Sequence, residues 1–313
     1  MDKNTRILVT GGNGMVGRNL VPLLRDAGYA SVVSSASADT DLRDEHAADA
    51  LMKSERPNIV LHLASRVGGI KANMSDPVGF LTDNLRIGTN VLLAARRYGV
   101  TKLINLGSSC IYPRECPQPM KEEYMLTGLL EPTNEGYAIA KIATLKLCAF
   151  LHQQEKMNCF TLVPPNLYGL HERMDAEHSH VIAGLMMKFH RAKREAAPSV
   201  TLWGSGSARR EFLFAEDAAR AIVHFMEHVE AEEIEGNFLN VGSGTDVSIR
   251  ELAELMKTVV GYKGDILWDT AQPDGMPRKL MDSSRLQRFD WRPQVNLEEG
   301  LRRMYDAYAA SNG

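Results

Sequence analysis

A glycine-rich stretch near the start of the chain separates an apolar run from a helical pattern. The segment RILVTGGNGMVGRNL (6–20) places Gly11, Gly14 and Gly17 directly after residues typical of a buried strand. Glycines at this spacing let the backbone turn tightly and approach a pyrophosphate, whose charge then meets the N-terminus of the following helix. The stretch therefore predicts the opening strand, turn and helix of a dinucleotide-binding fold.

The same alternation continues through the first half of the chain. Apolar runs predict strands at 6–10, 31–35, 58–64, 102–108 and 159–165. Helical patterns lie between them at 14–28, 45–55, 76–98 and 134–156. Pro22 lies inside the first helix and predicts a kink there. Near-continuous apolar strands separated by helices indicate a parallel sheet that is covered on both faces.

After residue 166 the pattern changes. Predicted helices follow at 179–195, 215–230 and 248–260, with short strands at 200–203 and 237–241. Polar connectors rich in glycine and proline interrupt them. We therefore expect an α/β fold: a Rossmann-type, doubly wound parallel sheet over residues 1–166, and a smaller C-terminal α/β lobe for substrate over 167–313. Some C-terminal segments are expected to return to the large domain.

Composition excludes several classes of function. The net charge of -3 gives no electrostatic case for binding nucleic acid or an anionic membrane. No apolar stretch approaches the ~20 residues needed to cross a bilayer, and the N-terminus does not read as a signal peptide, so we expect a cytoplasmic protein. The four cysteines form no CxxC pair, which predicts reduced thiols and no metal site: Cys110, Cys116, Cys148 and Cys159.

The end of the second predicted strand bears on the choice of cofactor. An acidic residue there would bond a ribose 2′-hydroxyl and repel a 2′-phosphate. This strand ends in Ser34 and Ser35, whose hydroxyls can donate to a phosphate, and the next acid is Asp39. The pattern favours NADP(H) over NAD, although no arginine stands in the obvious place. Asp41 and Leu42 could line the adenine pocket.

A tyrosine and a lysine lie four residues apart on one helical face. An ammonium group at Lys141 would favour the phenolate of Tyr137 and move its pKa from ~10 toward neutral. The same lysine could hold the nicotinamide ribose. Ser108 lies at the carboxyl end of the fourth predicted strand, the edge where ligands bind in open α/β sheets. Together the three residues predict hydride transfer at a carbonyl group.

These residues resemble the extended short-chain dehydrogenase/reductase family over nearly the whole chain. The matching motifs are TGGNGMVG, HLAS, GSSCIYP, YAIAK, PPNLYG and REFLFAEDAA. The resemblance implies an enzyme that modifies nucleotide-activated sugars. Ser108 is followed by Ser109 and Cys110 and lacks the acid pair that sugar-nucleotide dehydratases carry, so dehydration is disfavoured.

Four further segments are similar to family members that epimerise and reduce GDP-4-keto sugars: VGGI (67–70), EPTNEGYAIAK (131–141), NVGSGTDVSIRELA (240–253) and PDGMPRKLMD (273–282). This similarity implies NADPH-dependent 3,5-epimerisation and C4 reduction of GDP-4-keto-6-deoxy-D-mannose to GDP-L-fucose. A related enzyme for a colitose or deoxyheptose pathway sugar is the nearest alternative. A non-catalytic NADP(H)-sensing module is disfavoured, because such modules should lose the catalytic tyrosine or lysine.

The resemblance also implies roles for single residues. Cys110 and His180 would exchange the protons at C3 and C5, with His178 as a rival for His180. The GDP-sugar would contact Lys188, Trp203, Arg210 and Asp274. The cofactor would contact Gly11, Gly12, Asn13, Gly14, Met15, Val16, Gly17, Ser34, Ser35, Asp41, Leu42, Leu63, Ala64, Leu106, Gly107, Ser108, Tyr137, Lys141, Pro164, Asn166, Leu167 and His180.

Two positions depart from the family pattern. Pro165 replaces an expected threonine, and Asn13 stands where some relatives have an arginine that faces the 2′-phosphate. The resemblance further implies a homodimer, formed by the predicted helices 76–98 and 134–156.

Overall fold

A computed structural model describes residues 1–175, 180–272 and 274–312. Its largest sheet has six strands in the order β2-β1-β3-β4-β5-β9, and every neighbouring pair is parallel. The predicted parallel sheet is therefore confirmed. Its strands are β1 (Ile7–Thr10), β2 (Val32–Ser35), β3 (Ile59–His62), β4 (Lys102–Leu106), β5 (Asn158–Val163) and β9 (Phe238–Asn240).

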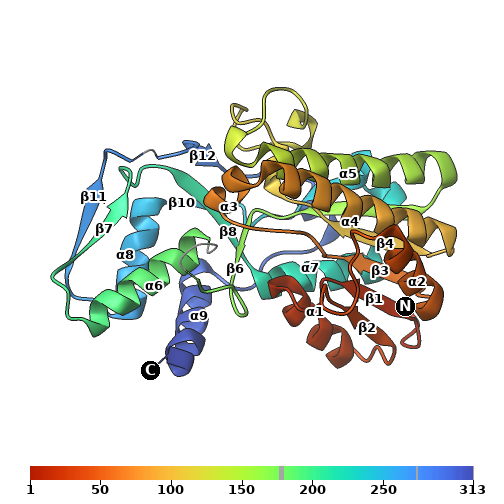
Figure 1. Cartoon of the computed structure of the whole chain (residues 1–313), viewed down its shortest axis with the longest axis horizontal. Helices are drawn as coiled ribbons and strands as arrows, with labels where there is room; N and C mark the ends of the chain where they lie inside the picture. Colours follow the sequence, from red (N-terminus) through yellow and green to blue (C-terminus); the bar gives the residue numbers. More distant parts are fainter. Residues whose placement is uncertain (176–179, 273, 313) are drawn as a thin grey trace.

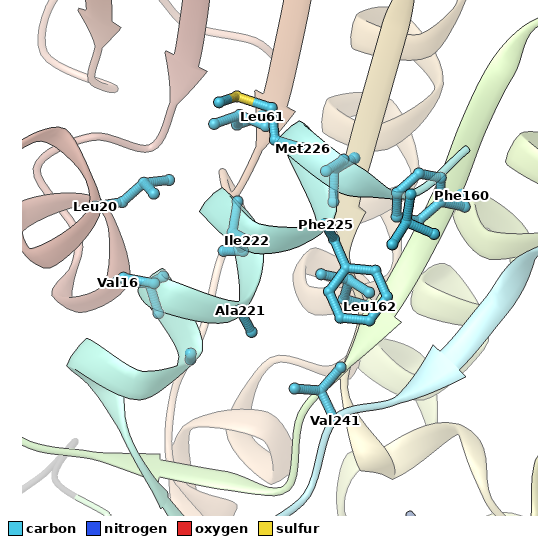
Figure 2. Close-up of a cluster of buried hydrophobic side chains, with 14 of the residues drawn as sticks. Val16, Leu20, Leu61, Phe160, Leu162, Ala221, Ile222, Phe225, Met226 and Val241 are labelled. Carbon is cyan, nitrogen blue, oxygen red and sulfur yellow. The ribbon is translucent and has the colours of Figure 1, made fainter. Parts of the chain in front are cut away.

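Helices cover both faces of this sheet (Figure 1). On one face lie α1 (Met15–Asp26) and α7 (Ala215–His228); on the other lie α2 (Glu45–Glu55), α4 (Pro77–Arg97) and α5 (Glu135–Glu155). Figure 2 shows the apolar core between α7, α1 and the sheet, where Leu20, Phe160 and Phe225 are fully buried. Burial of apolar surface on both faces is the main source of stability for such a sheet.

The remaining elements form a smaller lobe with its own apolar core. β6 (Asn166–Tyr168), β10 (Asp246–Ser248) and β12 (Arg278–Lys279) all pair with β8 (Arg209–Phe214), while β7 (Ser199–Trp203) pairs with β11 (Asp265–Asp269). The helices around them are α6 (Val181–Arg194), α8 (Ile249–Val260) and α9 (Leu297–Asn312). The segment with β9 and α7 lies on the large domain, although the chain reaches it only after β6 to β8.

Several elements were not predicted. No helix was predicted at α9 or at α3 (Ile70–Ser75), and the strands of the small lobe other than β7 were left unassigned. These strands are short and all but β6 carry charged residues, so the alternation of apolar side chains is weak. α1 continues from Met15 to Asp26 with Pro22 inside it.

The order of the strands reverses between β1 and β3. β1 is followed by a connection to β2 on one side, and the chain then returns to β3 on the other side. In open parallel sheets the crevice for ligands lies at this switch point, beyond the carboxyl ends of the strands. Thr10, His62 and Leu106 are the last residues of three such strands, and they mark the edge where a site is expected.

Candidate active site

The turn after β1 leaves no room for a side chain at Gly11, Gly12 or Gly17. Gly11 has φ +75°, and a Cβ there would lie 2.7 Å from the Ala64 backbone nitrogen. A Cβ on Gly12 would lie 1.8 Å from Ser34 Oγ, and one on Gly17 would lie 2.5 Å from the Gly11 carbonyl oxygen. The requirement predicted at Gly11 and Gly17 therefore has a steric cause in the backbone, whereas a Cβ on the third predicted glycine, Gly14, would lie 3.2 Å from the Gly11 carbonyl oxygen.

The first turn of α1 presents free backbone N–H groups. Its N-cap is Gly14, no side chain caps the helix, and no acid lies in the first turn, which contains Met15 and Val16. The preceding Gly11 and Gly12 N–H groups are bonded to the Ser35 carbonyl oxygen at 2.8 and 3.1 Å. An uncapped helix start with this geometry suits a pyrophosphate.

The end of β2 carries the two predicted serines. Ser34 is exposed, whereas Ser35 is buried and its hydroxyl has no hydrogen-bond partner. An unpartnered buried hydroxyl is costly and fits a site that a polar ligand completes. The glycine cradle and these hydroxyls fit the phosphates and ribose of a dinucleotide, and Asn13 lies within the same turn.

Arg43 lies on the connection after β2 and was not among the predicted site residues. Arg43 donates to the Asp41 carboxylate at 2.8 Å and lies 3.6 Å from Asp83. The Arg43 guanidinium lowers the pKa of Asp41 to about 2. The Asp41 carboxylate is thus already paired with the Arg43 guanidinium, and the neighbouring Leu42 is buried in the core.

The Ser108, Tyr137 and Lys141 side chains gather at the carboxyl end of β4. Lys141 Nζ donates to the Leu106 carbonyl oxygen at 2.9 Å and lies 5.7 Å from the centre of the Tyr137 ring. The Tyr137 hydroxyl has the Ser65 and Ser108 hydroxyls as neighbours. Ser65 was not predicted, although it ends the HLAS motif.

The expected shift of the tyrosine pKa toward neutral is not what the structure shows. Burial raises the pKa of Tyr137, the Cys110 thiol raises it further, and the Ser65 and Ser108 hydroxyls lower it only in part. The physical reason is that Lys141 is buried and directed at a backbone carbonyl oxygen. Tyr137 is therefore a neutral phenol, the form that can donate a proton to a carbonyl oxygen.

Burial also disfavours the charged forms of other groups in this region. It lowers the pKa of Lys141 to about 8. His62, at the end of β3, is fully buried with Nδ1 2.7 Å from Thr10 Oγ1, and burial lowers its pKa to about 3. His62 therefore links the ends of β1 and β3 as a neutral group, and it ties the two sides of the switch point together.

Cys110 lies directly beside this cluster. It is in the 3₁₀ turn Ser109–Ile111, 5% exposed, and its backbone N–H donates to Ser108 Oγ at 3.4 Å. Burial raises the pKa of its thiol, and the ammonium group of Lys279 is the strongest influence in the opposite direction. Lys279 belongs to the segment 273–282 but was given no role in the sequence analysis. It lies opposite Arg210 where β12 pairs with β8.

His180 comes from the other lobe. It is the N-cap residue of α6, its residue is exposed, and desolvation by its surroundings lowers its pKa. In Figure 1 this end of α6 is the one nearer the large domain. His178 lies outside the described residues.

The other predicted cofactor residues follow strand ends or lie on β6. Gly107 has no space for a Cβ, which would meet Thr161 Cγ2 at 2.9 Å. The Pro164 carbonyl oxygen accepts from Ser109 N–H at 3.2 Å, and the Asn166 amide donates to the Glu211 carbonyl oxygen at 3.0 Å. The remaining positions are Leu63 and Ala64 after β3, Leu106 at the end of β4 and Leu167 in β6.

The four predicted substrate residues all lie in the small lobe. Trp203 is 59% exposed, and Lys188 is exposed on α6. Asp274 accepts hydrogen bonds from Ser205 N–H at 2.6 Å and Ser205 Oγ at 2.7 Å. Arg210 is half-buried, and burial lowers the pKa of its guanidinium.

Over the described ranges, no three His, Cys, Asp or Glu side chains gather as a metal site would require. Within the same ranges no helix is long and apolar enough to cross a membrane.

With this geometry in hand, comparison with known proteins defines the class. The chain belongs to the NAD dependent epimerase/dehydratase family, whose model matches residues 7–242. Among individual relatives, it is 46% identical over 308 residues to a putative GDP-L-fucose synthase of Arabidopsis thaliana, covering 98% of this chain and 93% of the relative. It is 42% identical to the GDP-L-fucose synthase of Escherichia coli K12, covering 96% and 95%.

Solved structures agree with the fold. A GDP-6-OMe-4-keto-L-xylo-heptose reductase from Campylobacter jejuni matches with a TM-score of 0.95 at 30% identity, covering 100% of this chain and 99% of that one. A GDP-L-fucose synthetase from Naegleria fowleri, bound to NADP, matches with a TM-score of 0.88 at 25% identity, covering 100% and 96%. The Rossmann-type fold class is thereby confirmed.

Proposed function

We propose that the chain is a GDP-L-fucose synthase. It would convert GDP-4-keto-6-deoxy-D-mannose to GDP-L-fucose by epimerisation at C3 and C5 and reduction at C4. The observation that carries this proposal is the cluster of Ser108, Cys110, Tyr137 and Lys141 at one strand end, in a chain similar over its full length to proteins of that name. A plain reductase has no need for a thiol beside its proton donor.

The reduction adds a hydride to C4 and a proton to O4. NADPH supplies the hydride when it is bound. Tyr137, kept neutral by burial, donates the proton to O4, and the Ser108 hydroxyl hydrogen-bonds the same oxygen. Lys141 stabilises the phenolate that remains after the transfer. The low pKa of the Lys141 ammonium means that it can also return a proton to Tyr137.

The epimerisations exchange protons that are acidic because the C4 carbonyl delocalises the charge of the enolate. Inverting a centre requires one group to remove a proton and another to deliver one from the opposite face. We assign these roles to Cys110 and His180, which come from different lobes. Ser108 and Tyr137 would stabilise the enolate oxygen with the same donors that later serve the reduction.

The cofactor of this proposal is NADP(H). The glycine cradle and the uncapped start of α1 would hold the pyrophosphate. Ser34 and the unpartnered Ser35 hydroxyl support a ribose 2′-phosphate, with Arg43 nearby on the connection after β2. NADPH and NADH titrations of the protein, followed by fluorescence, test this; equal affinity for both would contradict the preference.

Turnover tests the proposed substrate. NADPH absorbance should fall when GDP-4-keto-6-deoxy-D-mannose is added, and should fall much more slowly with a GDP-4-keto-heptose. The second substrate is worth the comparison because the similarity to a GDP-heptose reductase extends over the whole chain. If the GDP-4-keto-heptose is reduced faster, a GDP-heptose reductase replaces GDP-L-fucose synthase as the proposed function. If neither sugar is reduced by protein that binds NADPH, the enzyme proposal fails.

A homodimer and a cytoplasmic location remain part of the proposal. Apolar side chains stay exposed on both α4 and α5, with Val78 70%, Leu93 40%, Ile139 41% and Phe150 53% exposed. Paired helices with uncovered apolar residues support a second copy of the chain as the partner. Light scattering at micromolar concentration should give twice the mass of the chain, and Phe150→Glu should shift it toward the monomer.

A further inference from the structure

One segment of the large domain extends toward the small lobe. The segment Ser65–Asp76, which contains α3, follows β3 and precedes α4. In Figure 1, α3 lies at the end of the large domain that is nearer the small lobe. The segment begins at the catalytic cluster, because the Ser65 hydroxyl neighbours Tyr137.

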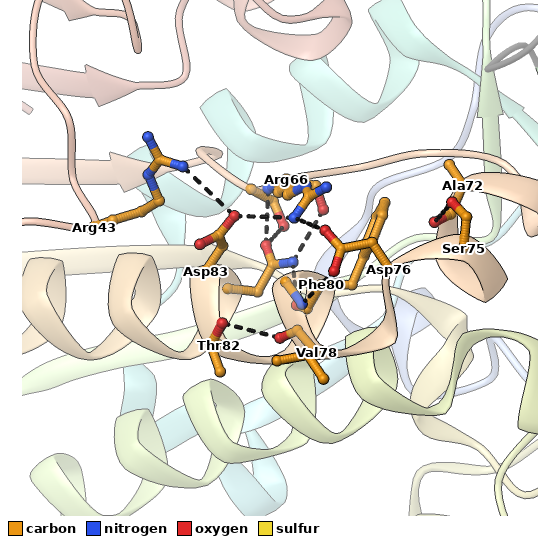
Figure 3. Close-up of polar contacts among 12 residues, drawn as sticks. Arg43, Arg66, Ala72, Ser75, Asp76, Val78, Phe80, Thr82 and Asp83 are labelled. Carbon is orange, nitrogen blue, oxygen red and sulfur yellow. Dashed lines mark hydrogen bonds and ion pairs between the residues drawn. The ribbon is translucent and has the colours of Figure 1, made fainter.

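A polar network holds this segment on α4 (Figure 3). The Asn84 amide oxygen accepts from Ser65 Oγ at 2.7 Å and from Arg66 N–H at 2.8 Å, and the Asn84 amide nitrogen donates to the Arg66 carbonyl oxygen at 3.0 Å. Arg66 also pairs with Asp76 at 2.8 Å and with Asp83 at 3.1 Å. The ends of the segment are therefore anchored by several bonds, and a satisfied polar network of this kind makes the segment rigid.

The anchored segment brings one lysine to the substrate side. Lys71 Nζ lies 5.4 Å from the centre of the Trp203 ring, which belongs to the small lobe and is 59% exposed. An ammonium over an exposed indole is a weak attraction. This contact nevertheless joins the two lobes at a residue that we have assigned to the GDP-sugar.

A second ammonium group lies in the same place. Partial burial lowers the pKa of Lys188, and the positive charge of the neighbouring Lys71 lowers it further. Within the described parts of the chain, neither lysine has a carboxylate at ion-pair distance. Two cations close together without an acid repel each other, and an anionic ligand would remove that cost.

We propose that Lys71, from the large domain, and Lys188, from the small lobe, together bind the diphosphate of the GDP-sugar beside Trp203. This inference rests on the proposed function and adds a residue to its substrate site. It also means that both lobes contribute charge to one ligand, so that substrate would hold them together over the catalytic cluster.

The binding of GDP to the full-length protein, measured by calorimetry with NADPH present, tests this assignment. Lys71→Met should weaken GDP about tenfold, the effect of losing one charge-assisted hydrogen bond at a partly solvated site. Lys71→Arg should recover most of the affinity, since the charge is kept. Lys53→Met is the matched control, because Lys53 is exposed on α2, and it should bind GDP like the wild type.

Further probes separate the possible outcomes. Inorganic pyrophosphate should compete with GDP in the wild type and compete less well in Lys71→Met, and both effects should shrink at high salt. Unchanged GDP affinity in Lys71→Met overturns the assignment, as does a loss of NADPH affinity in its place. A wild type that turns over the GDP-sugar while Lys71→Met binds GDP normally leaves the proposed function standing. If the wild-type protein binds no GDP, both the Lys71 assignment and the proposed function are wrong.

Discussion

The two sides of the site are built in different ways. On the large domain, the groups that we assign to the cofactor follow the ends of β1, β2, β3 and β4, and backbone contacts fix them. On the small lobe, charged residues are fixed by partners far away in the sequence. Glu211 is an example: its fully buried carboxylate accepts from Met281 N–H at 2.8 Å, Gly244 N–H at 2.8 Å and Ser243 Oγ at 3.2 Å.

This difference separates chemistry from recognition. In a parallel sheet, local sequence sets where each strand ends and therefore where the reacting groups lie. The positions of the groups at the carboxyl ends of the strands can therefore vary little. The small lobe places its charges through contacts between distant segments, which can change with little cost to the sheet. We therefore expect substitutions at the strand ends to alter the chemical step, and substitutions of the small-lobe residues Lys188, Trp203 and Arg210 to alter substrate binding. His180 and Lys71 are the two exceptions, since the first is a small-lobe residue assigned to the chemistry and the second a large-domain residue assigned to the substrate.

The largest expected effect is on the strand-end side. Tyr137→Phe removes the proton donor for O4 and should lower the rate of C4 reduction by roughly 10²–10⁴-fold. The affinity for NADPH should change much less, because the glycine cradle is untouched. Single-turnover NADPH oxidation and fluorescence titration measure the two quantities. A variant that reduces the ketone normally would remove Tyr137 from the mechanism.

Cys110→Ser should affect one reaction and spare the other. We expect deuterium exchange from solvent at C3 and C5 to be lost, while some reduction of the unepimerised ketone continues. Because burial raises the pKa of the thiol, thiolate content and alkylation of Cys110 should rise as the pH is raised above neutral. Cys116→Ser is the control, since Cys116 is only half-buried and has no assigned role. Normal exchange in Cys110→Ser would refute this role.

Gly17→Ala tests the cradle. The added methyl group would lie 2.5 Å from both the Gly11 carbonyl oxygen and Gly12 Cα, so the turn must shift. We expect a loss of about 1–3 kcal/mol in the free energy of unfolding, which is typical of overpacking, and weaker NADPH binding. Gly184→Ala, in α6, is the control, because a Cβ there meets nothing within 4 Å. Equal melting temperatures and affinities for the two variants would contradict the steric account.

The smallest expected effect is a change in pH dependence. Lys141 has a pKa of about 8, so its ammonium is present below that pH and is lost as the pH rises through it. The rate of reduction should therefore fall on the alkaline side of pH 8. Lys141→Arg keeps its charge at these pH values and should flatten that limb, although the altered geometry lowers the rate overall. An identical alkaline limb in both proteins would assign it to another group.

The same contrast explains what the sequence could predict. The glycine turn, the parallel sheet and the Ser108–Tyr137–Lys141 cluster follow from local patterns, and the sheet order confirmed the doubly wound fold. Lys71, Lys279 and Ser65 were missed because their relevance depends on which distant residues they meet. The predicted direction of the Tyr137 pKa shift was wrong. Sequence spacing shows that Lys141 is near Tyr137, but it does not show that the effect of burial outweighs the effect of the lysine charge.

The central claim is that one cluster carries out both epimerisation and reduction. NMR analysis of the product formed by the wild-type protein in deuterated water, with NADPH and GDP-4-keto-6-deoxy-D-mannose, tests it most directly. The account predicts GDP-L-fucose with deuterium at C3 and C5 and with hydrogen from NADPH at C4. A product that is reduced at C4 but keeps the protons and configuration of the substrate at C3 and C5 would contradict it.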